Sequence, residues 1–471
     1  MKYQPFQSHN LEVYLHGVAG TQGLRAKFKE VIDRDIKLLN KYGDNLKDAF
    51  GVPENWWDDR NRAAMVQLAD GSWKVKEEKP SWREMSGENN WKGMLQPLDD
   101  HLRQHIIHYG EMAQATYDSY DSDDNSRTGG NCKFAMDELF SRVGLHKGRA
   151  KKKYIVTKYI YASASTWPFE KDTNWMGYVA VSTDEAAKSS DHERRDIVVS
   201  WRGSHDALEW MDDLEFWLKP APLIFGKNID HDEKPEVHSG FYSIYTLCNN
   251  KSNFCNKSAR EQVLDEVTRL MNKYENEEIS VTVTGHSLGA ALTTLSAVDI
   301  AQNISNRPNT LVTAFAFASP RVGDSTFAAT AAALPNLRIL RIENRPDLVP
   351  DLPPNFVGFT DAGQELLFDT SKSRHMKYQL FQSHNLEVYL HGVAGTQGLR
   401  NKFKEVVERD ITLLNKYGDN LKDIFGVPEN WWDERNRAAM VQLADGSWKV
   451  KEEKSILVTS YLAMFAPYLT S

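Results

Sequence analysis

Residues 279–300 read ISVTVTGHSLGAALTTLSAVDI, and the fold is decided within this stretch. Val281 and Val283 alternate with threonines, which is the period of two typical of a β-strand. The end of the stretch carries small and apolar residues at helical spacing and contains no proline. Between these parts, residues 285–289 form a complete G-x-S-x-G pattern. We therefore predict a strand, a sharp turn and a helix, in that order.

The turn gives Ser287 a chemical role. A serine on a sharp strand-to-helix turn has a strained backbone with close neighbours on both sides, so only glycine fits at the flanking positions. The turn lifts the hydroxyl above the end of the strand, where a developing oxyanion would meet the Leu288 amide and the positive end of the helix dipole. The pattern alone also occurs as an ordinary glycine-rich turn, but its position between a strand and a helix favours a nucleophilic serine.

Composition excludes several classes of protein. A chain of 471 residues can hold two or three domains, and 41% hydrophobic with 26% charged residues is ordinary for a globular protein. The net charge of -8 gives no basic surface that would indicate nucleic acid as a partner. Three cysteines, none in a C-x-x-C pair, are too few for a disulfide framework. We therefore expect a reducing compartment and a cytoplasmic location.

Neither end of the chain predicts a membrane anchor. The first residues, MKYQPFQSHNLEVYLHG, lack the apolar core of a signal peptide. Residues 455–471 are uncharged and rich in apolar side chains, but Pro467 interrupts them and they fall short of the roughly 20 residues that a spanning helix needs. We interpret this apolar tail as a stray or packed segment, or one that touches a membrane surface, and we expect no transmembrane segment.

A long repeat flanks the unique part of the chain. Residues 1–79 recur as 376–454 with seven differences. Two copies around one unique body do not form a solenoid, in which each unit stacks on its neighbours. We interpret the front copy as a duplicated terminal segment that is a passenger, residues 80–454 as one functional domain, and 376–454 as its native copy. A permuted protein that uses the front copy, or a swapped dimer, remains open.

Hydrophobic periodicity predicts an α/β fold. In each copy, apolar residues near helical spacing predict a helix over 23–42 or 398–417, followed by a two-stranded hairpin. In the unique body the spacing predicts helices over 98–117 and 259–274. Strands are predicted at 154–162, 176–181, 197–201, 310–318, 337–342 and 365–368. Strands that alternate with helices indicate a mostly parallel sheet that is covered by helices.

A serine nucleophile needs a base that a carboxylate holds in place. In sheets of this kind the partners follow the serine in the order Asp or Glu, then His. Asp347 directly follows the strand at 337–342, which would put it at the same sheet edge as Ser287, whereas we expect Asp324 to serve a structural turn. The histidines that follow Asp347 are at positions 375, 384 and 391.

No metal site is predicted. Three histidines lie at helical spacing at positions 101, 105 and 108, but no set of carboxylates and cysteines accompanies them. We therefore interpret them as ordinary helix residues and expect no metal and no organic cofactor.

Five motifs in order carry a family resemblance: SWRGSHDALEWMDDL, TGHSLGAAL, FASPRVGD, NRPDLVPDLPP and SHNLEVYLH. Together they resemble the class 3 lipases, and specifically the plant phospholipase A1 enzymes of class II, over about residues 81–454. The resemblance implies an α/β-hydrolase fold with a nucleophile elbow and a mostly parallel central sheet. It also implies Ser287 as nucleophile, Asp347 as orienting carboxylate and His384 as general base.

The same resemblance implies the rest of the site and its substrate. Ser204 and the Leu288 amide would form the oxyanion hole, and residues 205–216 a short lid. The implied activity is hydrolysis of the sn-1 ester of a glycerophospholipid at a membrane or micelle surface. Neutral acylglycerols, galactolipids and a catalytically silent lipid-binding role remain open. The apolar run over 216–225 could line an acyl groove, form a membrane-facing lip or simply pack in the core.

The extra front copy departs from the family pattern and duplicates the predicted base, because His9 corresponds to His384. Loop closure over a long span costs little additional entropy, so His9 is not excluded on that ground. The chain order favours His384, which follows Asp347 as the family order requires.

Overall fold

The computed structural model describes residues 79–451 with gaps, and the backbone of two short strands in the front copy. These strands, β1 (Met65–Gln67) and β2 (Trp73–Val75), pair in an antiparallel hairpin. The rest of the front copy up to residue 78, which includes His9, lies outside the described residues. The predicted lid at 205–216 and the tail after residue 451 lie outside them as well. The gaps are 124, 146–153, 164–173, 189–193, 205–216, 227–233, 250–251, 253, 305–308, 378–380 and 444.

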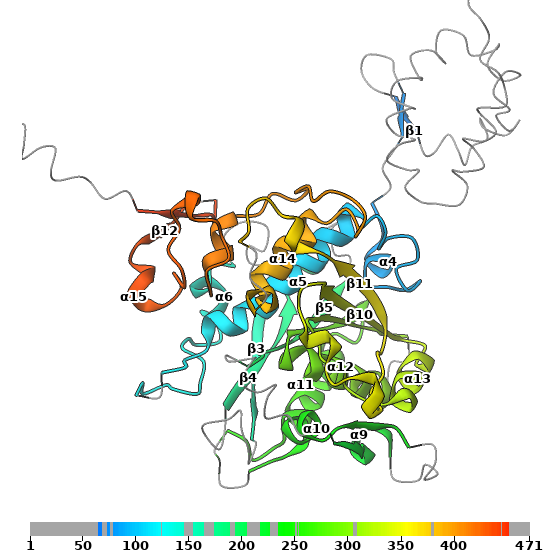
Figure 1. Ribbon diagram of the computed structural model, residues 1–471. Helices are drawn as coiled ribbons and strands as arrows, with labels where there is room; N and C mark the ends of the chain where they lie inside the picture. Colours follow the sequence, from blue (N-terminus) through cyan, green and yellow to red (C-terminus); the bar gives the residue numbers. More distant parts are fainter. Residues whose placement is uncertain are drawn as a thin grey trace, which may run out of the picture.

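A seven-stranded sheet forms the centre of the molecule (Figure 1). Its strand order is β11-β10-β9-β8-β5-β4-β3. The five strands from β11 to β5 run parallel, whereas β4 and β3 are antiparallel to their neighbours. The predicted mostly parallel sheet is confirmed. The strands are β3 (Tyr154–Ala162), β4 (Asn174–Ser182), β5 (Arg195–Trp201), β8 (Ile279–His286), β9 (Leu311–Phe317), β10 (Leu337–Asn344) and β11 (Gln364–Phe368).

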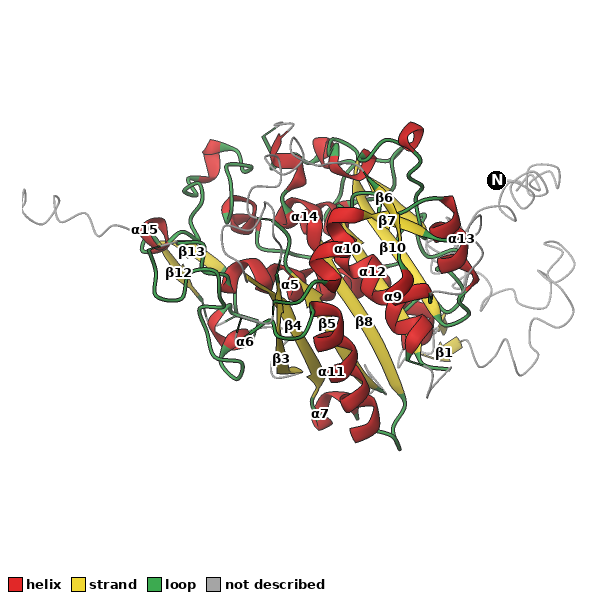
Figure 2. Cartoon of the chain, turned by 90° about the horizontal axis from the view of Figure 1, so that it is seen from below, coloured by secondary structure: helices red, strands yellow, loops and turns green. Residues whose placement is uncertain are grey.

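Helices cover both faces of this sheet. Val281 and Val283 pack in the core beneath α10 (Ser239–Thr246), α11 (Ala259–Lys273) and α12 (Leu288–Asn303), which lie across one face in Figure 2. On the opposite face, Phe315 and Phe317 pack against α5 (Asp100–Ser119) and α14 (Leu386–Gly395). Alternate strand residues therefore serve two separate cores, which is why the strands read as almost wholly apolar.

Shorter elements complete the described part of the chain. Asp324 is the N-cap of α13 and accepts a hydrogen bond from the Phe327 N–H at 2.7 Å, so its predicted structural role is confirmed. The other short helices and strands are α4 (Trp82–Met85), α6 (Leu139–Arg142), α7 (Asp184–Ala187), α9 (Pro222–Phe225), α13 (Ser325–Ala333), α15 (Glu434–Arg437), β6 (Leu218–Pro220), β7 (Glu236–His238), β12 (Met440–Gln442) and β13 (Trp448–Val450). The 3-10 turns are η3 (Val349–Asp351), η4 (Asn355–Val357), η5 (Thr370–Lys372), η6 (Phe381–His384), η7 (Ile411–Asn415) and η8 (Asp423–Phe425).

The helix predicted over 398–417 is wrong for the second copy. The structure has loops there and the single 3-10 turn η7, whereas the α-helix of this copy, α14, begins and ends earlier. Arg409 and Lys416 find buried acidic partners on α14 and α5, and these tertiary contacts outweigh the local preference for a helix. The predicted hairpin is confirmed, because β12 and β13 pair antiparallel.

None of the three cysteines takes part in a disulfide bond in the described part of the chain. None of the described helices combines the length and the apolar character that crossing a bilayer requires.

Candidate active site

The turn between β8 and α12 is a nucleophile elbow. Ser287 has φ 59° and ψ -127°, a backbone conformation that residues other than glycine rarely adopt. A Cβ added at Gly285 would lie 2.4 Å from the Gly289 carbonyl oxygen, and one at Gly289 would lie 2.6 Å from the Trp201 carbonyl oxygen. Both flanking positions therefore require glycine, as the pattern predicted.

Asp347 and His384 meet beside this elbow. Asp347 follows the end of β10, and His384 ends η6 just before α14 begins. The His384 Nδ1 atom lies 2.7 Å from the Asp347 Oδ2 atom. The same oxygen accepts the Tyr389 hydroxyl at 2.5 Å, and Asp347 Oδ1 accepts the Val349 N–H at 3.0 Å. Burial raises the pKa of Asp347, but His384 and these donors outweigh it and lower the pKa, so the carboxylate is ionised at neutral pH.

His286 connects the elbow to His384. Its Nε2 atom lies 2.6 Å from the His384 carbonyl oxygen, and its Nδ1 atom lies 2.8 Å from the Tyr117 hydroxyl on α5. Burial first, and then the nearby His384, lower the pKa of His286 to about 3, so the ring is neutral. A carbonyl oxygen can only accept, so Nε2 carries the proton and Nδ1 accepts from Tyr117. This chain of contacts places His384 against the residue that precedes Ser287.

Two atoms in the site are buried without a hydrogen-bond partner among the described residues: Ser287 Oγ and His384 Nε2. The Ser287 residue is 0% exposed and His384 is 7% exposed. Because His384 Nδ1 donates to Asp347, the Nε2 lone pair is the one available to take a proton. The structure thus brings the predicted His384 and Asp347 into direct contact, and His286 ties His384 to the residue that precedes Ser287.

The predicted oxyanion residues also adjoin the elbow. Leu288 is the first residue of α12, and the first N–H groups of a helix have no acceptor within it. Ser204 is half-buried in the loop after β5. A Cβ added at the neighbouring Gly203 would lie 2.5 Å from the His286 carbonyl oxygen, so this loop packs directly on the elbow. The buried Arg202 guanidinium holds the loop, donating to the Gly203 carbonyl at 2.8 Å and the Trp175 carbonyl at 3.0 Å.

Sequence reasoning missed four supporting residues: Tyr117, His286, Asn344 and Tyr389. Asn344 donates to the Ser383 carbonyl oxygen at 3.0 Å and so fixes the residue before His384. Three of the four stood inside motifs that had been recognised, since His286 is the variable residue of G-x-S-x-G, Asn344 opens NRPD and Tyr389 lies within SHNLEVYLH. Tyr117 had no signal, because its role depends on how α5 crosses the sheet.

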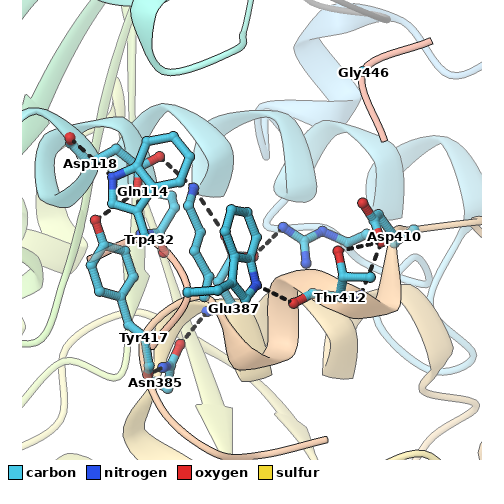
Figure 3. A network of polar contacts seen from close by, with 12 residues as sticks. Gln114, Asp118, Asn385, Glu387, Asp410, Thr412, Tyr417, Trp432 and Gly446 are labelled. Atoms are coloured by element: carbon cyan, nitrogen blue, oxygen red, sulfur yellow. Dashed lines mark hydrogen bonds and ion pairs between the residues drawn. The ribbon is translucent and has the colours of Figure 1, made fainter. Parts of the chain in front are cut away.

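The second copy holds His384 in place through a buried polar network, shown in Figure 3. Asn385, the N-cap of α14, donates to the Tyr417 carbonyl oxygen, and Glu387 in the first turn pairs with Arg409. Lys416 Nζ lies 2.6 Å from Asp118 Oδ2 on α5. The segment that carries His384 is therefore tied to both the rest of its own copy and the unique body. No cluster of potential metal ligands occurs in the described ranges.

Comparison with known proteins places the chain in a family. The family described as lipase (class 3) matches residues 198–357. Phospholipase A1-IIgamma of Arabidopsis thaliana is 47% identical over 396 residues, which covers 79% of this chain and 93% of that protein. The chain belongs to the class II phospholipase A1 family. Phospholipase A1-II 1 of Oryza sativa subsp. indica, another member, is 43% identical over 388 residues, which covers 79% of this chain and 96% of that protein.

Solved fungal lipases are more distant from this class II phospholipase A1 chain. A triacylglycerol lipase from Penicillium expansum is 21% identical and matches 57% of this chain and 80% of its own, with a TM-score of 0.38. The strand order, the elbow and the family membership identify the fold as that of an α/β hydrolase.

Proposed function

We propose that this protein is a serine acyl hydrolase that cleaves the sn-1 ester of glycerophospholipids. The observation that carries the proposal is that Asp347 Oδ2 lies 2.7 Å from His384 Nδ1, while His286, which precedes the strained and buried Ser287, contacts the His384 carbonyl oxygen. This is the arrangement that activates a serine hydroxyl for acyl transfer.

In the proposed mechanism His384 Nε2 takes the Ser287 proton as the serine oxygen attacks the ester carbonyl carbon. The Ser204 hydroxyl and the Leu288 N–H stabilise the oxyanion of the tetrahedral intermediate. The intermediate collapses by breaking the carbon–oxygen bond to the alcohol, and His384 returns the proton to that leaving oxygen. Water then repeats the sequence on the acyl-enzyme and releases the fatty acid.

The substrate class is supported by the names of the relatives, which are phospholipases A1. We propose a phospholipid in a membrane or micelle as the substrate, and a cytoplasmic location, which the small number of cysteines favours. Neutral acylglycerols and galactolipids present the same ester carbonyl with a different head group, so they are the alternatives to test.

The test is hydrolysis of a panel of phosphatidylcholine, monoacylglycerol, triacylglycerol and galactolipid esters, with Ser287→Ala as the blank. The proposal expects release of the sn-1 fatty acid from phosphatidylcholine by the wild type and none above background by the variant. A folded wild type that binds lipid without releasing fatty acid from any of these esters would sink the proposal and favour a silent binding protein.

A further inference from the structure

We propose that Cys248 and Cys255 form a reversible disulfide bond when the protein meets an oxidant such as a small-molecule disulfide. Both residues lie in the loop between α10, which ends at Thr246, and α11, which begins at Ala259. Neither cysteine takes part in a disulfide bond in this structure. The proposed ester chemistry uses neither thiol, so this site is separate from the catalytic one.

The backbone of the loop brings the two residues together. The Asn249 N–H, which directly follows Cys248, donates to the Cys255 carbonyl oxygen at 2.8 Å. A hydrogen bond between these atoms keeps the Cα atoms of the two cysteines within roughly 7 Å of each other. Disulfide bonds join residues whose Cα atoms are about 4.4–6.8 Å apart. The loop thus already has the closure that a disulfide between its ends requires.

The side chain of Cys255 lies against the same peptide unit. Burial, the largest cause, and the nearby Cys248 raise the pKa of the Cys255 thiol to about 11. The Asn249 N–H opposes them as a hydrogen-bond donor to the Cys255 sulfur. The Ser252 hydroxyl accepts the Cys255 N–H at 3.2 Å and helps to hold the residue in this position. Main chain and side chain thus both place Cys255 next to Cys248.

The two thiols differ in their access to solvent, which gives them different roles. Cys248 is exposed, whereas Cys255 is 0% exposed and its sulfur lies 3.6 Å from the Tyr161 carbonyl oxygen on β3. An oxidant in solution therefore reaches Cys248 first. A buried thiol with a raised pKa is inert toward such an oxidant, so Cys255 serves as the resolving thiol for a modified Cys248.

The proposed reaction is thiol–disulfide exchange in two steps. The Cys248 thiolate attacks one sulfur atom of the small disulfide, whose S–S bond breaks and releases one thiol. Cys255 then gives up its proton to solvent, and its sulfur attacks the Cys248 sulfur and displaces the second thiol. Two electrons pass from the cysteine pair to the oxidant, which leaves as two thiols. In a reducing compartment the pair remains as thiols and closes only under oxidation, as redox-sensing disulfides do.

Cys132 provides a matched control within the same chain. It is buried like Cys255, being 9% exposed, but it belongs to the core on the α5 face of the sheet. Its sulfur lies 3.3 Å from the Tyr159 hydroxyl. A change of Cys132 should therefore leave the chemistry of the loop unaltered.

The experiment treats the reduced full-length chain with oxidised glutathione, blocks the remaining thiols and maps the products by mass spectrometry. Lys251 lies between the two cysteines in the sequence, so trypsin places them on separate peptides that only a disulfide holds together. We expect the wild type to lose two thiols in parallel and to yield this linked pair of peptides at any protein concentration, and dithiothreitol to restore both thiols.

Three serine variants assign the roles of the thiols. Cys132→Ser should form the linked pair of peptides as the wild type does. Cys255→Ser should instead accumulate a glutathione adduct on Cys248, because no resolving thiol is left. Cys248→Ser should keep its Cys255 thiol at least about tenfold longer than the wild type does, because that thiol is buried.

A wild type that accumulates the glutathione adduct on Cys248 while Cys255 keeps its thiol would overturn the inference, as would a wild type that keeps all its thiols. A disulfide between two molecules, or one that contains Cys132, would overturn it as well. The readout is the state of the thiols and not ester turnover, so a protein without hydrolase activity gives an equally clear answer.

Discussion

Replacing Lys416 by methionine should destabilise the protein strongly, because it removes one charge from a buried network. The Lys416 side chain is 5% exposed and its Nζ atom lies 2.6 Å from Asp118 Oδ2 and 3.7 Å from Glu387 Oε1. Removing one partner of such a pair leaves an uncompensated buried charge and costs about 3–5 kcal/mol of the free energy of unfolding. Burial already raises the pKa of Asp118 and Lys416 opposes that effect. The difference in the free energy of unfolding between wild type and variant should therefore shrink as the pH falls and Asp118 takes up a proton.

The assay is urea unfolding followed by tryptophan fluorescence, with two control variants. Lys257 and Asp265 are also 2.6 Å apart but each is 60% exposed, so Lys257→Met should have no measurable effect. Lys41→Met makes the same change in the front copy and should also leave the midpoint unchanged. In the double variant Lys416→Met/Asp118→Leu much of the lost stability should return, because no stranded charge is left on Asp118.

Two outcomes would refute this reasoning. If Lys416→Met unfolded at the wild-type urea concentration, the network would not stabilise the fold. If Lys41→Met were destabilising and Lys416→Met were not, the front copy and not the second would occupy this place.

Three further results are expected. Tyr389→Phe removes the hydroxyl that donates a hydrogen bond to Asp347 Oδ2 at 2.5 Å, so kcat should fall by about tenfold while KM stays unchanged. An unaltered kcat would show that Asp347 does not need this hydrogen bond. Burial is the main reason why the pKa of His238, His286 and His391 is lowered to about 3–4 in the folded protein. As the pH falls from about 6.5 toward 4, each of these histidines should therefore lower the free energy of unfolding by up to about 1.4 kcal/mol per pH unit. A free energy of unfolding that stays constant over this pH range would contradict the prediction. A chain that begins at Pro80 should match the full chain in activity if the front copy is a passenger, whereas a large loss would assign that copy a role.

The central sheet could be predicted from the sequence because its strands carry two independent signals. Val281 and Val283 show the period of two, and the glycines around Ser287 fix where the strand ends. The acid could be predicted as well, since Asp347 follows a strand and the carboxyl ends of parallel strands share one edge.

The backbone conformation of the second copy could not be predicted from the sequence in the same way. Its apolar residues around Val407 suggested a helix, yet Val406 and Val407 lie in a bend, in which Val407 is buried and Val406 is 40% exposed. What decides the backbone there is the burial of Arg409 and Lys416 against acids on α14 and α5, and this information is spread over some 300 residues of chain. The same applies to Tyr117 and Tyr389, whose partners lie on other elements.

The most direct test of the account is the turnover of phosphatidylcholine by His384→Ala and His9→Ala, each checked for folding by circular dichroism. The account predicts that His384→Ala reduces kcat by at least about a thousandfold while His9→Ala retains the wild-type value. Full activity in His384→Ala, or loss in His9→Ala, would contradict the placement of the catalytic base in the second copy.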